Sequence, residues 1–219
     1  MNVIRQLVIM GGKGGGEIVA NAAIAEISSG AAYTLKGFLN DDIAPGETIN
    51  GLPVLGLIED WHRLSQDTVF IPSLHNYKFM RERLEKIRSL RVPPERWMTV
   101  RHPLSSVAQD AKIGYGSYIG AFSVVESGAS VGNFASIRSG AYVSHDVQVG
   151  DYVFVGANST IAGRSRIGEG THVGPNAVVR DQLFISDFTT VGIGSVVVES
   201  IETPAVVGGN PARTMPRRF

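Results

Sequence analysis

The sequence predicts a mainly β protein in which a parallel β-helix follows a small α/β domain. The first observation is that Ile or Val occupies every sixth position from Val107 to Val197. The second is that a small residue usually lies two positions before each of them, and a glycine often follows. The third is that the first hundred residues alternate strand-like and helix-like segments. We therefore expect two domains, residues 1–100 and residues 101–219.

The period of six is typical of hexapeptide repeats that form a parallel β-helix. One hexad makes one flat face, and three hexads make a triangular coil of about 18 residues that stacks on the next at ~4.8 Å. The Ile and Val side chains point inward as columns, and the small residues fit the narrow corners. Sixteen such positions predict about five coils, which are stable only as a stack.

In the first hundred residues, the apolar run at residues 7–10 resembles a buried parallel strand, and glycines and then a helical apolar pattern follow it. Further strands are expected at Tyr33 to Leu39 and at Thr68 to Pro72, and a charged helix from about Tyr77 to Leu90. Alternating strands and helices indicate a small parallel, Rossmann-like sheet.

The glycine-rich segment 11–16 is a candidate phosphate site, because backbone N–H groups can approach an anion at a helix N-terminus. Asn40 and Asp41 end the second expected strand, where side chains suit ribose or base hydrogen bonding. The segment does not fit G-x-G-x-x-G cleanly, so a merely flexible turn is the alternative.

Composition excludes several classes of function. Basic and acidic residues balance at 20 each, so no nucleic-acid partner is expected. There is no cysteine, which excludes disulfides, a thiolate zinc site and a cysteine nucleophile. We expect no metal site. No segment has the length of a membrane span or the pattern of a signal peptide, so we expect no membrane partner and a cytoplasmic location.

Of the five histidines, His145 is the candidate general base. It follows an inward Val by two positions, so it points outward near a corner, and the residue one coil above it is Gly163. A base beside an empty slot with a backbone N–H at its rim is what acyl transfer needs. Asp146 either orients the imidazole or pairs with Arg164 one coil above. His172 has no comparable setting.

With its glycine turn, its His102-Pro103 junction, its coils and its closing Gly-Asn-Pro-Ala-Arg at 209–213, the chain resembles a known bacterial family. These are the nucleotide-sugar acetyltransferases of the left-handed β-helix (hexapeptide repeat) superfamily, such as bacillosamine and perosamine N-acetyltransferases and sialic-acid O-acetyltransferase-like proteins. The resemblance implies a left-handed helix, a homotrimer, acetyl-CoA between two prisms and a nucleotide sugar held by the N-terminal domain. It also implies a role in cell-surface polysaccharide biosynthesis.

Carried over residue by residue, the resemblance implies that His145 and Asp146 are catalytic and that Gly163 donates to the thioester oxygen. Contacts with acetyl-CoA are then expected at Gly163, Pro175, Ile193 and Ala212. Contacts with the nucleotide are expected at Lys13, Gly14, Gly15, Asn40 and Asp41.

Three departures from the family pattern affect the sugar pocket. Arg138 stands where Asn is common, Phe154 where a second active-site histidine is common, and Gly15 where a loop histidine is usual. We expect Arg138 and Phe154 to contact substrate. Arg138 is a permanent cation that can bind a carboxylate or a phosphate, and the alternative is a salt bridge across the trimer seam.

The function expected is transfer of acetyl from acetyl-CoA to an amino group, at C4, of a nucleotide-linked deoxyamino sugar, with His145 accepting the proton. Transfer to a sugar hydroxyl is one alternative. A non-catalytic scaffold that binds nucleotide sugars is another, and Phe154 and Gly15 are the residues that favour it. The sequence leaves open whether the nucleotide is UDP, GDP or dTDP.

Overall fold

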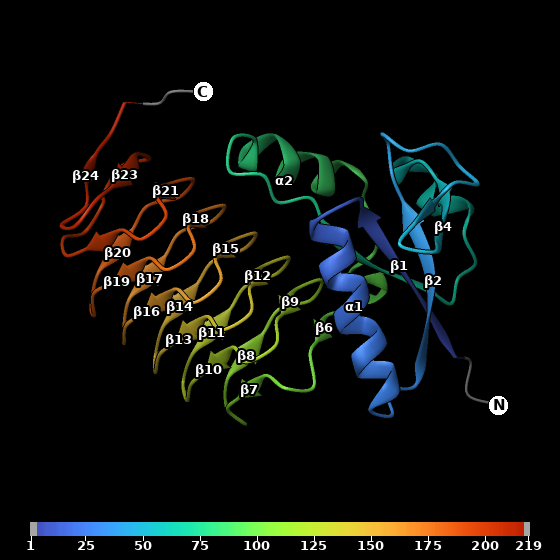
Figure 1. Ribbon diagram of the computed structural model, residues 1–219, viewed down its shortest axis with the longest axis horizontal. Helices are drawn as coiled ribbons and strands as arrows, with labels where there is room; N and C mark the ends of the chain where they lie inside the picture. Colours follow the sequence, from blue (N-terminus) through green and yellow to red (C-terminus); the bar gives the residue numbers. More distant parts are fainter. Residues whose placement is uncertain (1–3, 217–219) are drawn as a thin grey trace.

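Figure 1 shows the protein as a computed structural model that describes residues 4–216. The α/β sheet lies at one end of a stack of flat coils, and the stack ends at the short strands β23 (Val206–Gly208) and β24 (Arg213–Thr214). Helix α2 (Met80–Ser89) extends from the sheet along the side of the stack. No helix among residues 4–216 has both the length and the apolar character needed to cross a membrane.

The α/β domain is built on a five-stranded sheet with strand order β3-β4-β2-β1-β5. Its elements before α2 are β1 (Arg5–Gly11), α1 (Gly15–Ser28), β2 (Tyr33–Leu39), β3 (Thr48–Ile49), β4 (Leu52–Gly56), η1 (Ile58–Arg63) and β5 (Thr68–Ser73). A short turn, η2 (Pro94–Arg96), follows α2. The three predicted strands, β1, β2 and β5, are parallel, as expected; β4 also runs parallel to β2, whereas β3 is antiparallel to β4. The β3–β4 hairpin and η1 were not expected. The charged helix, predicted from about Tyr77 to Leu90, is observed only over Met80–Ser89.

The coils present three faces, each a ladder of two-residue strands. Face 1 contains β7 (Ser106–Val107), β10 (Val124–Val125), β13 (Tyr142–Val143), β16 (Thr160–Ile161), β19 (Val178–Val179) and β22 (Val196–Val197). Face 2 contains β8 (Lys112–Ile113), β11 (Ser130–Val131), β14 (Gln148–Val149), β17 (Arg166–Ile167) and β20 (Phe184–Ile185). Face 3 contains β6 (Val100–Arg101), β9 (Tyr118–Ile119), β12 (Ser136–Ile137), β15 (Phe154–Val155), β18 (His172–Val173) and β21 (Thr190–Val191), and then β23 and β24.

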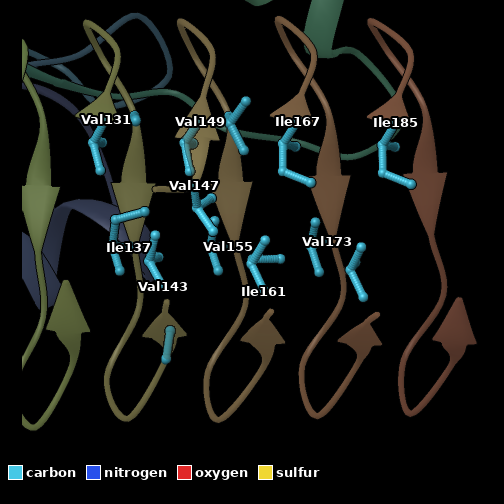
Figure 2. Close-up of a cluster of buried hydrophobic side chains, with 14 of the residues drawn as sticks. Val131, Ile137, Val143, Val147, Val149, Val155, Ile161, Ile167, Val173 and Ile185 are labelled. Atoms are coloured by element: carbon cyan, nitrogen blue, oxygen red, sulfur yellow. The ribbon is translucent and has the colours of Figure 1, made fainter. Parts of the chain in front are cut away.

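The hexapeptide prediction is confirmed, and the fold is a left-handed parallel β-helix preceded by an α/β domain. Each strand from β7 to β22 ends on a predicted inward aliphatic residue, and the coils pair in an 18-residue register, as in Val125 opposite Val143. Figure 2 shows these side chains in rows along the stack, one of them formed by Val131, Val149 and Ile167. At several corners the small residue is a serine whose hydroxyl donates a hydrogen bond to a backbone carbonyl, as Ser123 Oγ does to the Gly120 carbonyl at 2.6 Å.

The α/β domain covers face 3 through two apolar clusters. In the first, α1 and the sheet pack against Val100 and Tyr118 of the first coils. In the second, α2 and the edge of the sheet pack against Phe134 and Tyr152. Because burial of these apolar side chains is the main driving force for docking, the two domains meet along a defined surface rather than through a free linker.

Candidate active site

His145 and Asp146 form a pair at the corner between face 1 and face 2, which we call the 1–2 corner. His145 Nδ1 lies 2.9 Å from Asp146 Oδ2. A carboxylate only accepts hydrogen bonds, so in the neutral imidazole the proton lies on Nδ1 and Nε2 keeps its lone pair. The side chains are 52% and 61% exposed, so a substrate can reach them. The alternative partner, Arg164, forms no ion pair with Asp146 within residues 4–216.

Two glycines provide the space for this pair. A Cβ at Gly163 would lie 2.6 Å from His145 Nε2, so the imidazole occupies the slot that a side chain would fill. A Cβ at Gly128, one coil below, would collide with Asp146 Oδ1. The Gly163 N–H has no acceptor among the described residues, so it can donate to a ligand. A base, its orienting carboxylate and a free N–H therefore lie together, as the 18-residue column predicts.

A cavity of about 610 Å³ opens between the α/β domain and face 3. This volume lies within the usual range for small-molecule sites. The α/β domain contributes its glycine turn, the segments after β2 and β5, and Arg83, while the coils contribute Ser136, Arg138 and Phe154. The cavity therefore brings together four of the five predicted nucleotide residues, all except Gly14, with both predicted sugar-pocket residues.

The glycine turn packs against the end of β5. A Cβ at Gly15 would lie 2.8 Å from Ser73 Oγ, which shows how closely the turn packs against the end of β5. Lys13 and Gly15 line the cavity. Gly14 does not, and its N–H already donates to Glu17 Oε2 at 2.8 Å. A phosphate contact from the Gly14 N–H would therefore require Glu17 to move.

Asn40 and Asp41 also line the cavity, but their polar groups are largely used within the fold. Asn40 Nδ2 donates to the Gly11 carbonyl at 3.0 Å, and its Oδ1 accepts two backbone N–H groups of the following loop. Asp41 pairs with Lys86 and accepts the Ile58 N–H at 3.0 Å, and the lysine contact holds the pKa of Asp41 below its usual value. Their contact with a base stays a prediction.

Sequence reasoning missed an aromatic stack that connects the two domains. His75, from the segment after β5, stacks on Tyr152 at 4.2 Å between ring centroids, and Phe154 stacks on His172 at 4.5 Å. Burial lowers the pKa of His75 to about 3 and that of His172 to about 4. Three polar atoms of the stack are buried without a partner: His75 Nε2, His172 Nδ1 and the Tyr152 hydroxyl. His172 has no setting like that of His145, as expected, but its buried place in this stack was not foreseen.

The residues expected to contact acetyl-CoA do not all lie together in one chain. Pro175 and Ile193 are neighbours at the corner between face 3 and face 1, the 3–1 corner, where Pro175 accepts the Gly194 N–H at 2.9 Å. Ile193 is 77% exposed. Ala212 lies at the end of the stack, where its N–H donates a hydrogen bond to the Val196 carbonyl. Gly163 lies instead at the 1–2 corner, so face 1 separates it from Pro175 and Ile193.

Comparison with known proteins agrees with this architecture. The bacterial transferase hexapeptide family (six repeats) matches residues 128–163 and 146–181. The acetyltransferase domain of PglB from Neisseria gonorrhoeae, in complex with acetyl coenzyme A, is 29% identical, with 97% of this chain and 100% of that chain covered and a TM-score of 0.85. PerB from Caulobacter crescentus, in complex with CoA and GDP-perosamine, is 26% identical over 98% of this chain and 99% of that chain, with the same TM-score.

WeeI from Acinetobacter baumannii shares the fold, at 24% identity over 96% of this chain and 100% of that chain, with a TM-score of 0.81. No curated protein matches the chain. Among residues 4–216 there is no group of three or more His, Asp or Glu side chains that could hold a metal ion. The repeats, the likeness along almost the whole chain and the complexes of similar proteins with acetyl-CoA and CoA lead to one conclusion: the protein is an acyltransferase that carries bacterial transferase hexapeptide repeats and is similar in architecture to bacterial sugar acetyltransferases.

Proposed function

We propose that the protein transfers acetyl from acetyl-CoA to the C4 amino group of a nucleotide-linked deoxyamino sugar, with His145 as the general base. The observation that carries this proposal is the position of the imidazole, oriented by Asp146 and seated in the slot of Gly163. The proton on Nδ1 leaves Nε2 free to accept another.

The chemistry follows from this arrangement. The amine nitrogen attacks the thioester carbonyl carbon and gives its proton to His145 Nε2. The Gly163 N–H donates to the oxyanion that forms, as donors of this kind do in acyl transfer. The C–S bond then breaks. The CoA sulfur either takes the proton from the imidazolium or leaves as a thiolate while the imidazolium gives its proton to water, and in both cases His145 returns to its neutral form.

The cavity supports a nucleotide sugar as the acceptor. Its α/β wall offers Lys13 and the backbone of the glycine turn at the N-terminus of α1, which favours phosphate. Its coil wall offers Arg138 and Phe154. The similar protein PerB was solved with GDP-perosamine, a nucleotide-linked sugar. The nucleotide of the present protein is left to experiment.

A homotrimer would complete the site. The cavity lies over face 3 and the acetyl-CoA residues Pro175 and Ile193 lie at the 3–1 corner, whereas His145 and Gly163 lie at the 1–2 corner of the same chain. A ring that joins the 1–2 corner of one copy to the 3–1 corner of the next brings both sets together, and such head-to-tail contacts close into rings. The outward residues of face 1 suit this seam because several are apolar and partly exposed: Val124, Tyr142, Val178 and Val196.

The direct test is the variant His145→Ala. Because general base catalysis contributes about 10²- to 10⁴-fold, we expect kcat to fall by a factor in that range. CoA thiol release would be measured with acetyl-CoA and a panel of UDP-, dTDP- and GDP-linked 4-amino sugars, and a mass gain of one acetyl group would confirm the product.

The matched control is His62→Ala, which removes an exposed histidine in η1, away from both corners. This variant should keep full activity. Full activity in His145→Ala would refute the role of His145. Thiol release only with acceptors that carry a hydroxyl in place of the amine would replace N-acetyl transfer by O-acetyl transfer.

A further inference from the structure

Arg138 is held between two aromatic rings on face 3. Its guanidinium carbon lies 5.4 Å from the centre of the Tyr118 ring and 5.6 Å from the centre of the Phe154 ring. Tyr118, Ser136 and Phe154 are successive outward residues of one column, one coil apart. Because Ser136 is small, the guanidinium folds into the room between the two rings. The rings fix the position of the cation but do not neutralise its charge.

No carboxylate neutralises Arg138 within the part of the chain that the structure describes. None of the ion pairs among residues 4–216 includes it. Two acidic residues line the same cavity: Asp41 is paired with Lys86, and Asp42 forms no ion pair with Arg138. Burial lowers the pKa of Arg138, and the nearby Tyr118 phenol opposes this only in part. Keeping a half-buried guanidinium without a counter-ion costs free energy. An anionic ligand from outside the chain would therefore be stabilised at this position.

The position of Arg138 favours the sugar end of the substrate over the phosphates. Arg138 belongs to the coil wall of the cavity, beside Phe154, whereas Lys13 and the glycine turn belong to the α/β wall. A second unsatisfied group, the buried His75 Nε2, belongs to a residue that lines the same cavity. The planar guanidinium matches a carboxylate through two parallel hydrogen bonds.

We propose that the sugar accepted by this protein carries a carboxylate, and that Arg138 binds this carboxylate and makes the enzyme prefer acidic over neutral amino-sugar nucleotides. The proposal rests on the proposed function for the nucleotide-sugar site. The substrate class is a nucleotide-linked amino sugar acid, and Arg138 is a specificity-determining residue rather than a catalytic one.

The test uses pairs of probes that differ in a single group. UDP-glucuronate and UDP-glucose differ only in a carboxylate against a hydroxymethyl group, and matching GDP- and dTDP-linked pairs cover the other bases. Binding of each pair, and of free UDP, GDP and dTDP, would be measured by calorimetry. In the matching nucleotide series we expect the acidic member to bind about tenfold more tightly than the neutral one, because it adds a charge-assisted bidentate contact.

Arg138→Gln should remove this preference and leave binding of the neutral sugar and of the free nucleotide unchanged. Arg138→Lys should restore only part of it, because an ammonium is a point charge without the planar fork. The contrast variant is Lys13→Gln, at the α/β wall, which should weaken the acidic sugar, the neutral sugar and the free nucleotide alike.

Three results would overturn the proposal. The wild-type protein could bind acidic and neutral members equally. Arg138→Gln could weaken free nucleotide as much as the acidic sugar, which would assign Arg138 to the phosphates. Arg138→Gln could also keep the preference but change the oligomeric state in light scattering, which would assign Arg138 to a seam salt bridge. Thiol release with neutral amino-sugar nucleotides would distinguish these results from a failure of acetyl transfer itself.

Discussion

At the scale of single residues, the site depends on the absence of a side chain at Gly163. The His145 imidazole lies where a Gly163 side chain would be, and the nearest atom to that position is Nε2, the atom proposed to accept the proton. Gly163 is not among the glycines with positive φ. The backbone there therefore tolerates alanine, and the glycine is needed for space rather than for conformational freedom.

This distinction makes Gly163→Ala a sharp test. We expect the methyl group to displace the imidazole and to lower kcat by about 10²-fold or more, the scale of losing a general base. The melting temperature should change little, since the clash falls on a half-exposed side chain. CoA thiol release and thermal unfolding would be measured together.

The control for this variant is Ser127→Ala, in the same column one coil below His145, which loses only an exposed hydrogen bond to Asp110. Wild-type activity in Gly163→Ala would mean that the place of His145 beside Gly163 is not needed for the reaction.

The sequence was sufficient to predict the column of His145 and Gly163, because the hydrogen bonds between coils hold an 18-residue register. It was not sufficient for His75 or Arg83, which come from the α/β domain. Their position against face 3 follows from how two apolar clusters pack, and no repeat in the chain encodes that packing. The only sequence signal at His75 was its place just after an expected strand, where functional residues of α/β sheets gather.

At the scale of elements, the strands of the α/β domain were predicted with differing success. The strand Tyr33–Leu39 was predicted at its observed bounds, since the polar residues Asn40, Asp41 and Asp42 mark its end. The β3–β4 hairpin was missed, because segment 44–56 is rich in glycine and proline and reads as a loop. In the coils every hexad formed its strand, because stacking fixes each strand against two neighbours.

The stack of aromatic and histidine rings predicts a pH dependence of folding. His75 and His172 have pKa values lowered to about 3 and about 4, chiefly because burial disfavours the charged imidazole, and Arg138 adds to this at His75. In the unfolded chain both histidines take up protons near pH 6.5. Between these values the unfolded state binds more protons, so stability that is present above pH 6.5 is lost as the pH falls.

Between pH 7 and pH 5 we expect a loss of about 2 kcal/mol for each histidine in the free energy of unfolding. Urea unfolding at the two pH values would measure it. His172→Phe keeps a ring against Phe154 and should remove one histidine's share, whereas His62→Phe, at an exposed site, should remove none. Equal pH dependence in wild type and His172→Phe would contradict the assignment.

At the scale of the whole molecule, the three faces of the prism have different surroundings. Face 3 is covered by the α/β domain. Face 2 presents polar side chains over most of its length, such as Lys112, Gln148 and Arg166. Face 1 has apolar outward residues and lies between the two corners that hold the candidate site residues. The proposed trimer covers this face and completes the site in one step.

Mixing two impaired variants tests the shared site. His145→Ala damages the 1–2 corner, and Arg138→Glu, unlike Arg138→Gln, puts a negative charge into the cavity over face 3 and should block binding of the anionic substrate. If each site takes one corner from each of two neighbouring copies, an equal mixture of unfolded and co-refolded chains regains about a quarter of wild-type activity, because one pairing in four joins two intact corners. Thiol release would be measured before and after mixing. No recovery, with trimers present in light scattering, would place the whole site within one chain.

The coil of 18 residues has a consequence for how this chain can change in length. Each hexad rotates the chain by a third of a turn about the axis of the stack. The number of residues between two positions therefore decides which face or corner each of them occupies. Losing one hexad between Arg138 and His145 would carry His145 and Gly163 together to another corner, so both would change position relative to Arg138 even if every aliphatic column stayed intact. Losing a whole coil would shorten the prism but leave every later side chain on its original face or corner. Insertions and deletions within the stack are therefore compatible with function only in multiples of one 18-residue coil.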